Sequence, residues 1–183
     1  MMSSLEPPHH HQSATAARVN PHAVIRALQP ADRARHDALV AELDRLHHEA
    51  LPALIKPPAQ ARVPDDDFAQ RLSDPLVFLR GYELDGLLVG LIRAVLEEKP
   101  EGRAHHASRL VWIDELIVAR QARGNRIGYA LLQAAQNWAQ EVAASAIELK
   151  VYAFNVAAMD FYTAAGFRPR SLVLSRKLPQ QAL

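Results

Sequence analysis

One segment of the sequence joins a buried strand to an amphipathic helix through a short turn with little side-chain bulk. Ile113, Leu116, Ile117 and Val118 give the strand its apolar, β-branched side chains, and residues 127–142 repeat apolar side chains at helical spacing. The turn at 123–128 between them contains Gly124 and Gly128 together with two arginines. Because such a turn leaves N–H groups unpaired at the positive end of a helix, the segment predicts a phosphate-binding site.

Length and composition favour a single globular domain. The chain has 183 residues, of which 49% are hydrophobic, and this is enough to build one core. The formal net charge of +1 argues against nucleic acid or a charged membrane surface as a partner. The chain has no cysteine, which excludes disulfides, thiolate metal sites and a cysteine nucleophile. No apolar run is long enough to span a bilayer and no signal-peptide pattern is present, so we expect a cytoplasmic protein.

The N-terminal residues differ from the rest of the chain. The first 20 residues are small and polar, include two prolines and show no periodicity. We therefore expect residues 1–21 to be a disordered leader and residues 22–183 to form one domain. The histidines at 9–11 fit weak metal binding only, and no histidine spacing elsewhere matches a zinc site, so no metal site is expected.

The order of the predicted elements is typical of a mixed α/β or α+β fold. Strands are expected at 24–28, 76–84, 87–96, 106–118, 147–151 and 171–178, and helices at 32–48, 68–72, 126–144 and 155–165. The dipeptide Asp85-Gly86 is a strong signal for a two-residue hairpin. Residues 52–66, with four prolines and an acidic run that continues to Asp67, are expected to be loop. Three hairpin-connected strands followed by a strand–helix–strand unit predict a mostly antiparallel sheet flanked by helices.

Other phosphate-binding motifs are missing from the sequence. There is no G-x-x-x-x-G-K-S/T segment, which excludes a P-loop, and the turn lacks the three glycines of the dinucleotide fingerprint. A kinase-like enzyme is disfavoured because no lysine or Mg²⁺-ligand motif follows the turn.

Two motifs resemble the signatures of the GNAT acetyltransferase superfamily. The first, R-G-x-G-x-G at the start of a helix, is matched by residues 123–128, with Arg126 in the place of the middle glycine. The second, N-x-x-A-x-x-x-Y-x-x-x-G-F, is met in full by Asn155, Ala158, Tyr162, Gly166 and Phe167. The two motifs stand in the family's order within a likeness that covers about residues 111–178, and together they are more specific than either alone.

The resemblance implies that acetyl-CoA is the co-substrate. Its pyrophosphate would lie over the glycine-containing turn, and its pantetheine arm would pair with the strand that ends at Val118. The residues that the resemblance implies in this binding are Leu116, Ile117, Val118, Arg123, Gly124, Asn125, Arg126, Ile127, Gly128, Tyr129, Asn155, Ala158 and Tyr162. A helical φ would make Arg126 tolerable there, and its side chain either contacts phosphate or points to solvent. The side chains of 116–118 also suit core packing, which is compatible with main-chain pairing to the cofactor.

Acetyl transfer needs a proton donor for the leaving thiolate and an acceptor for the amine proton. Tyr162 follows Asn155 by two helical turns, and a phenol with a pKa of about 10 can donate to a thiolate. The alternative for Tyr162 is a packed aromatic side chain with a satisfied hydroxyl. Asp114 and Glu115 are paired candidates for base and substrate anchor, or else surface charge at an edge. They lie on opposite faces of a regular strand, and a bulge of the kind usual in this family would redirect one of them.

The sequence thus predicts an acyl-CoA-dependent N-acetyltransferase that works by direct transfer in a ternary complex. The acceptor is expected to be a primary amine on a small molecule or a peptide, and the oligomeric state stays open, with a homodimer as one option. Further candidates for the acceptor pocket are His47, His48, Glu97 and Glu98. The alternative from another functional class is a non-catalytic acyl-CoA sensor or interaction domain on the same fold.

Overall fold

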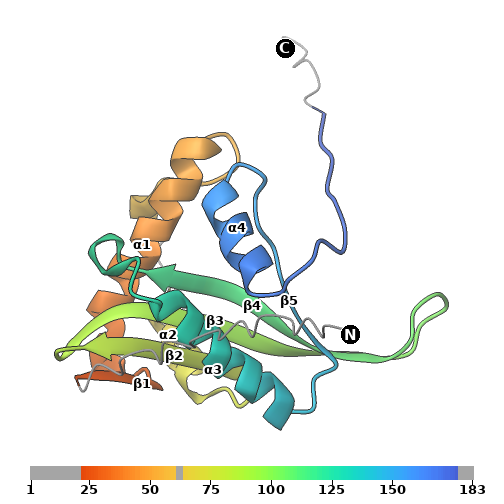
Figure 1. The fold of residues 1–183 in the computed structure, drawn as a ribbon, viewed down its shortest axis with the longest axis horizontal. Coiled ribbons are helices and arrows are strands. Elements are labelled where there is room, and N and C mark those ends of the chain that lie inside the picture. Colours follow the sequence, from red (N-terminus) through yellow and green to blue (C-terminus); the bar gives the residue numbers. More distant parts are fainter. Residues whose placement is uncertain (1–21, 61–63, 177–183) are drawn as a thin grey trace, which may run out of the picture.

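The computed structural model describes residues 22–60 and 64–176, and a five-stranded sheet lies at its centre (Figure 1). The strands, in their spatial order, are β1 (Ala23–Ala27), β2 (Val77–Leu84), β3 (Leu87–Lys99), β4 (Ser108–Val118) and β5 (Ala146–Leu149). Neighbouring strands from β1 to β4 are antiparallel, whereas β5 pairs with β4 in parallel. The mixed, mostly antiparallel sheet expected from the sequence is confirmed.

Helices cover both faces of this sheet. They are α1 (Arg33–Ala50), α2 (Asp65–Ser73), α3 (Ile127–Glu141) and α4 (Val156–Ala164), with short 3-10 turns η1 (Pro30–Asp32), η2 (Pro58–Gln60) and η3 (Arg120–Ala122). A Cβ at Gly90 would meet Ile127 and Leu131, so this position of β3 points to α3. Because successive strand residues point to opposite faces, Leu91 and Arg93 point away from α3.

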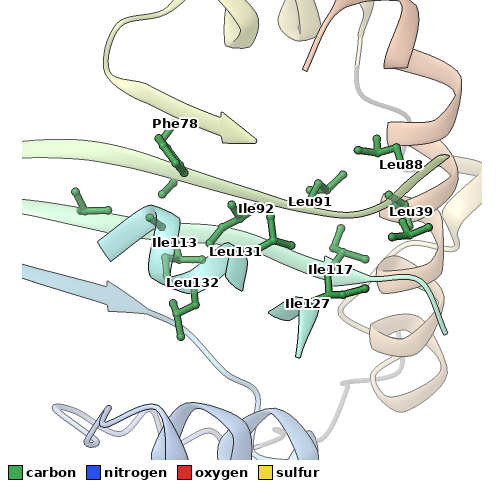
Figure 2. Close-up of a cluster of buried hydrophobic side chains, with 14 of the residues drawn as sticks. Leu39, Phe78, Leu88, Leu91, Ile92, Ile113, Ile117, Ile127, Leu131 and Leu132 are labelled. Carbon is green, nitrogen blue, oxygen red and sulfur yellow. The ribbon is translucent and has the colours of Figure 1, made fainter. Parts of the chain in front are cut away.

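The main core lies where α3 and α1 pack on β3 and β4. Figure 2 shows Leu131 of α3 beside Ile92 and Ile113 of the sheet, and Leu39 of α1 beside Leu88 at the other end of the cluster. A second, smaller cluster under α2 consists of Leu28, Phe68 and Leu79, with Leu72 and Val77 at its border. The described helices thus bury apolar faces against a shared sheet.

The hairpin between β2 and β3 forms where the sequence predicts it. Asp85 and Gly86 both have positive φ angles, 51° and 78°. Two consecutive residues with positive φ are the mark of the type I′ turn, whose twist matches that of the flanking strands. The Asp-Gly prediction is therefore confirmed.

Two expectations about secondary structure are wrong. No strand forms at 171–176, where Leu172, Val173 and Leu174 are 85–91% exposed. The short apolar run there suits a strand, but a strand also needs a partner for its main-chain groups. The acidic run expected in a loop instead begins α2 after Pro64, because proline and aspartate suit the start of a helix as well as a loop.

Some expectations fall outside the described part of the chain. The predicted leader at 1–21 and the last two residues of the predicted final strand, 177–178, are among these. Within 22–60 and 64–176, no helix combines the length and the hydropathy that a membrane span requires.

Candidate functional site

Strand β4 departs from regular pairing on both of its edges. On the β3 side, Arg93 lies opposite Glu115 while Ala94 lies opposite Ile113, so Asp114 is one extra residue, a β-bulge. On the other side, β5 pairs only with Leu110–Ile113, and no described strand pairs with residues 114–118. The bulge expected by resemblance is present, and β4 ends with an open edge.

Main-chain groups of β4 face this open edge. The N–H of Ala119 donates to the carbonyl of Val89 at 2.8 Å, so the main chain of Ala119 faces β3. Because main-chain groups alternate between the two edges of a strand, those of Leu116 and Val118 face the open edge, and those of Ile117 face β3. The side chain of Ile117 is buried in the core. An extended ligand lying along this edge would meet the N–H groups of Leu116 and Val118 and the carbonyl of Leu116, whereas the carbonyl of Val118 accepts a hydrogen bond from Arg123.

The turn after β4 presents unpaired N–H groups at the start of α3. Arg126 is the N-cap of α3, and its side chain makes no capping hydrogen bond. The N–H groups of Ile127, Gly128 and Tyr129 lie in the first helical turn, where the helix itself offers no acceptor. The macrodipole adds partial positive charge at the same place. This is the geometry of an anion site, as the sequence predicts.

The backbone of Arg126 corrects one expectation. A residue other than glycine is expected to be tolerable at this position if its φ is helical. Arg126 instead has φ 58° and ψ 12°, which is left-handed. Gly124, two residues earlier, has φ 84°. The left-handed region favours glycine because a Cβ there crowds the following carbonyl oxygen. Arg126 therefore adopts a backbone conformation that glycine favours, at a cost in backbone strain. Its side chain remains exposed.

We expect Arg126→Gly to raise the free energy of unfolding by about 1 kcal/mol, because it relieves this strain. Urea denaturation monitored by circular dichroism measures the change. Arg126→Ala is the matched control, since it also removes the guanidinium but keeps a Cβ at positive φ. Equal stabilities of the two variants would contradict the strain.

Arg123 is engaged within the fold. Its Nε donates to the carbonyl of Val118 at 2.9 Å, and its Nη2 donates to Oε1 of Glu42 in α1 at 3.1 Å. The same Glu42 oxygen accepts the N–H of Arg120 at 3.0 Å. In this state Arg123 and Glu42 fasten the turn to α1 and to the end of β4. Sequence reasoning missed Glu42 because it lies 81 residues from Arg123 along the chain.

Gly128 allows α4 to approach the start of α3 closely. A Cβ at Gly128 would meet the ring of Phe161 at 3.3 and 3.4 Å. The ring centroids of Tyr129 and Phe161 are 4.7 Å apart. The two signature motifs therefore come into contact through Phe161, a residue that sequence reasoning did not select.

The second signature motif caps α4 at both ends. Oδ1 of Asn155 accepts the N–H of Ala158 at 3.2 Å, which is an N-cap. At the other end, Gly166 has φ 93°, its N–H donates to the carbonyl of Thr163, and the N–H of Phe167 donates to that of Tyr162. These bonds form a Schellman motif, as the sequence predicts for the Gly-Phe pair.

Tyr162 lies in an aromatic setting on α4. Its ring centroid is 5.0 Å from that of Phe161 and 5.6 Å from that of Phe167. Burial raises the pKa of Tyr162 to about 12. The packed aromatic environment is present, and the phenol stays protonated well above neutral pH.

The bulge brings both candidate carboxylates to the same pair of arginines. Asp114 accepts a hydrogen bond from Nη1 of Arg93 at 2.6 Å, and Oε1 of Glu115 lies 3.7 Å from Nη1 of Arg71 in α2. Burial raises the pKa of Asp114, while the positive charges of Arg93 and Arg71 oppose this rise. The Glu115 side chain is 15% exposed and that of Asp114 is 30% exposed. Glu115 is therefore not surface charge, and α2 lies over this part of the sheet.

The remaining candidates lie in separate surroundings. Burial lowers the pKa of His47, whose ring packs edge-on against Tyr152 and Phe154. Nδ1 of His48 lies 2.7 Å from the carbonyl oxygen of Ile55. The far end of the β3–β4 hairpin carries two exposed ion pairs, Glu97–Lys99 and Glu98–Arg109. Among the described residues, no group of three or more His, Asp and Glu side chains could hold a metal ion.

Comparison with known proteins identifies the family to which this chain belongs. A family model described as "Acetyltransferase (GNAT) family" matches residues 40–167, well over half of the chain. The chain belongs to the GNAT acetyltransferase family. The resemblance stated from the two motifs is therefore confirmed.

Two relatives of this GNAT chain are known acetyltransferases. A mycothiol acetyltransferase of Sanguibacter keddieii is 30% identical over 175 residues, which are 93% of this chain and 51% of the relative. An aminoalkylphosphonate N-acetyltransferase of Salmonella typhimurium is 33% identical over 103 residues, which are 56% of this chain and 64% of the relative. This chain thus spans less than two thirds of the length of either relative.

Solved structures share the GNAT fold seen here. A mutant of a Bacillus halodurans protein superimposes with a TM-score of 0.81 at 20% identity, covering 85% of this chain and 99% of that one. The aminoglycoside N-acetyltransferase AAC(6')-Iy in complex with CoA superimposes with a TM-score of 0.65 at 17% identity, covering 87% and 99%. At these identities the likeness concerns the fold alone.

Proposed function

We propose that this GNAT protein transfers an acetyl group from acetyl-CoA to a primary amine of a small molecule or a peptide, in a ternary complex. The observation that carries the proposal is the uncapped start of α3 beside the open edge of β4. These two features lie where the pyrophosphate and the pantetheine arm of one CoA molecule would need them. The relatives named as acetyltransferases support the same reaction class.

In this proposal CoA uses main-chain groups for most of its contacts. The pyrophosphate accepts hydrogen bonds from the N–H groups at 124–129. The side chain of Arg126, which belongs to the same turn, adds a positive charge beside the phosphates. The pantetheine arm pairs with Leu116 and Val118 as an added strand, in the place from which β5 has separated. Asn155, Ala158 and Tyr162 border the arm on α4. The Asn155 oxygen caps the helix, which leaves its amide N–H groups as donors.

We assign the base to Asp114 and the substrate anchor to Glu115. An alkyl ammonium has a pKa of about 10.4 and must lose a proton before its nitrogen can attack the thioester carbon. A base works best when its pKa is near the working pH, and burial raises the pKa of Asp114. Asp114 is also the more exposed of the two acids. Glu115, held near Arg71, then binds the amine without taking its proton.

The hydroxyl of Tyr162 acts as a hydrogen-bond donor to the leaving sulfur. A thiol with an ordinary pKa of about 8.5 is a stronger acid than a phenol with a pKa of about 12. Complete proton transfer from Tyr162 to the thiolate would therefore cost about 5 kcal/mol. A hydrogen bond that strengthens as the carbon–sulfur bond breaks stabilises the thiolate without this cost. We thus keep Tyr162 as the donor to the leaving sulfur, but as a hydrogen-bond donor and not as an acid that transfers its proton completely.

Calorimetry with CoA, followed by a screen of amines for thiol release from acetyl-CoA, tests the function. We expect CoA to bind, and pantetheine, which lacks the pyrophosphate, to bind at least about 10-fold more weakly, since several N–H donors lose their partner. We also expect thiol release to depend on an added amine.

The outcomes separate the two functional classes. Failure of CoA to bind would remove the proposal altogether. Tight CoA binding without thiol release for any small-molecule or peptide amine would favour a non-catalytic acyl-CoA sensor on this fold.

A further inference from the structure

Two arginines lie beside the candidate catalytic acids and are only partly used by them. Arg93, in the middle of β3, donates one hydrogen bond to Asp114 at 2.6 Å. Arg71 reaches in from α2, and its Nη1 stays 3.7 Å from Glu115, beyond hydrogen-bonding distance. A guanidinium carries five N–H donors in a planar fork, so each arginine has more donors than these carboxylates occupy.

Three buried polar atoms of this cluster have no hydrogen-bond partner among the described residues. They are Nη1 of Arg71, Nε of Arg93 and Oε2 of Glu115. Buried charged groups are seldom left in this way, because losing water without gaining a partner costs free energy. The side chains of Arg71 and Arg93 are still 22% and 19% exposed. The cluster therefore borders solvent and is open to a solute.

The balance of charge indicates what kind of solute fits. With both acids ionised, the two arginines and two carboxylates are neutral together. When Asp114 takes the proton of the acceptor ammonium, it no longer balances Arg93, and the cluster carries one excess positive charge. An oxyanion on the same acceptor restores neutrality and matches the fork of donors on a guanidinium. A simple amine has no group that could do so.

We propose that the acceptor is a small zwitterion, a primary amine with a carboxylate or phosphonate group, and that Arg71 and Arg93 bind the oxyanion. This rests on the proposed acetyl transfer and names its acceptor class. The amine lies at Asp114 and Glu115, and the oxyanion takes guanidinium donors that the carboxylates leave open. Arg71 and Arg93 thus determine which amines are acetylated.

Acceptors of similar length that differ in charge provide the main test with the full-length protein. Thiol release from acetyl-CoA is measured with propylamine, 3-aminopropanol, β-alanine and 2-aminoethylphosphonate. We expect kcat/KM to be at least about 10-fold higher for the two zwitterions than for the two amines that lack an oxyanion, as one charge-assisted contact implies. The order of β-alanine and 2-aminoethylphosphonate identifies the preferred oxyanion.

The variant Arg71→Gln tests the assignment to a side chain. We expect it to raise KM for the preferred zwitterion about 10-fold while CoA affinity by calorimetry stays the same. Arg71→Lys should restore part of the loss, because it keeps the charge without the fork. Arg109→Gln, at the exposed end of the β3–β4 hairpin, is the control and should leave the ratio between acceptors unchanged.

The outcomes distinguish this inference from the function on which it rests. Equal rates for amines with and without an oxyanion, or a preference for peptide amines, would overturn the inference and leave acetyl transfer in place. Failure of the wild-type protein to bind CoA would instead rule out the proposed acetyl transfer itself. If Arg71→Gln does not fold, the comparison of acceptors in the wild-type protein still decides.

Discussion

Asp114→Asn is expected to lower kcat for amine acetylation by about 10²–10⁴, the usual range for loss of a general base. Asparagine keeps the size of the side chain and an acceptor for Arg93, whose Nη1 is 2.6 Å from the carboxylate. It cannot take up the ammonium proton. Steady-state kinetics with a fixed amine measure the loss, and calorimetry with CoA checks that the cofactor site is intact.

The pH profile separates the base from a merely structural acid. Asp114 works as a base only when ionised, so activity rises with pH through its pKa. Because burial raises that pKa, the acidic limb should lie above the ordinary pKa of an aspartate. The limb should disappear in Asp114→Asn and remain in Glu115→Gln, which should mainly raise KM. The reverse pattern would exchange the roles of the two acids.

Tyr162→Phe is expected to lower kcat by about 10²-fold while CoA binding changes little, because only a contact to the developing thiolate is lost. The phenylalanine ring can keep the packing against Phe161 and Phe167. Burst and steady-state measurements of thiol release give the rate. Since the pKa of Tyr162 is about 12, kcat/KM should show no loss through tyrosine ionisation near pH 10.

Tyr152→Phe is the matched control for this variant. Tyr152 stacks on Phe154 in the segment between β5 and α4, outside the signature motif, and loss of its hydroxyl should leave the rate unchanged. An unchanged rate in Tyr162→Phe would limit that residue to packing and leave the proposed acetyl transfer without a tyrosine donor.

Local signals in the sequence predicted the local parts of the fold and of the site. Asp85-Gly86 set a turn through backbone preferences that act over two residues. The motif from Asn155 to Phe167 carries the two caps of α4, and each cap closes hydrogen bonds within a few residues. Interactions of this range can be predicted without knowledge of the remaining fold.

Interactions between distant parts of the chain could not be predicted in the same way. Arg71 appears in the sequence as one charged residue of a short helix, and only the fold brings it to Glu115. Glu42 meets Arg123 across 81 residues. The left-handed φ of Arg126 could not be predicted either, since an arginine by itself prefers a right-handed or extended backbone.

One extra residue in β4, Asp114, determines which face of the sheet the side chains on either side of it point to. Side chains in a strand alternate with a period of two, so a single insertion reverses the facing of everything beyond it. Without the bulge at Asp114, the pairing with β3 could keep only one half of β4 in register. Either the core residue Ile117 or the core residue Ile113 would then point to the opposite face of the sheet. Deletion of one residue at the bulge would therefore make the pairing with β3 regular, whereas an insertion or deletion elsewhere in β4 would reverse the facing of part of the strand. The hairpin tip beyond Lys99 is free to change in length.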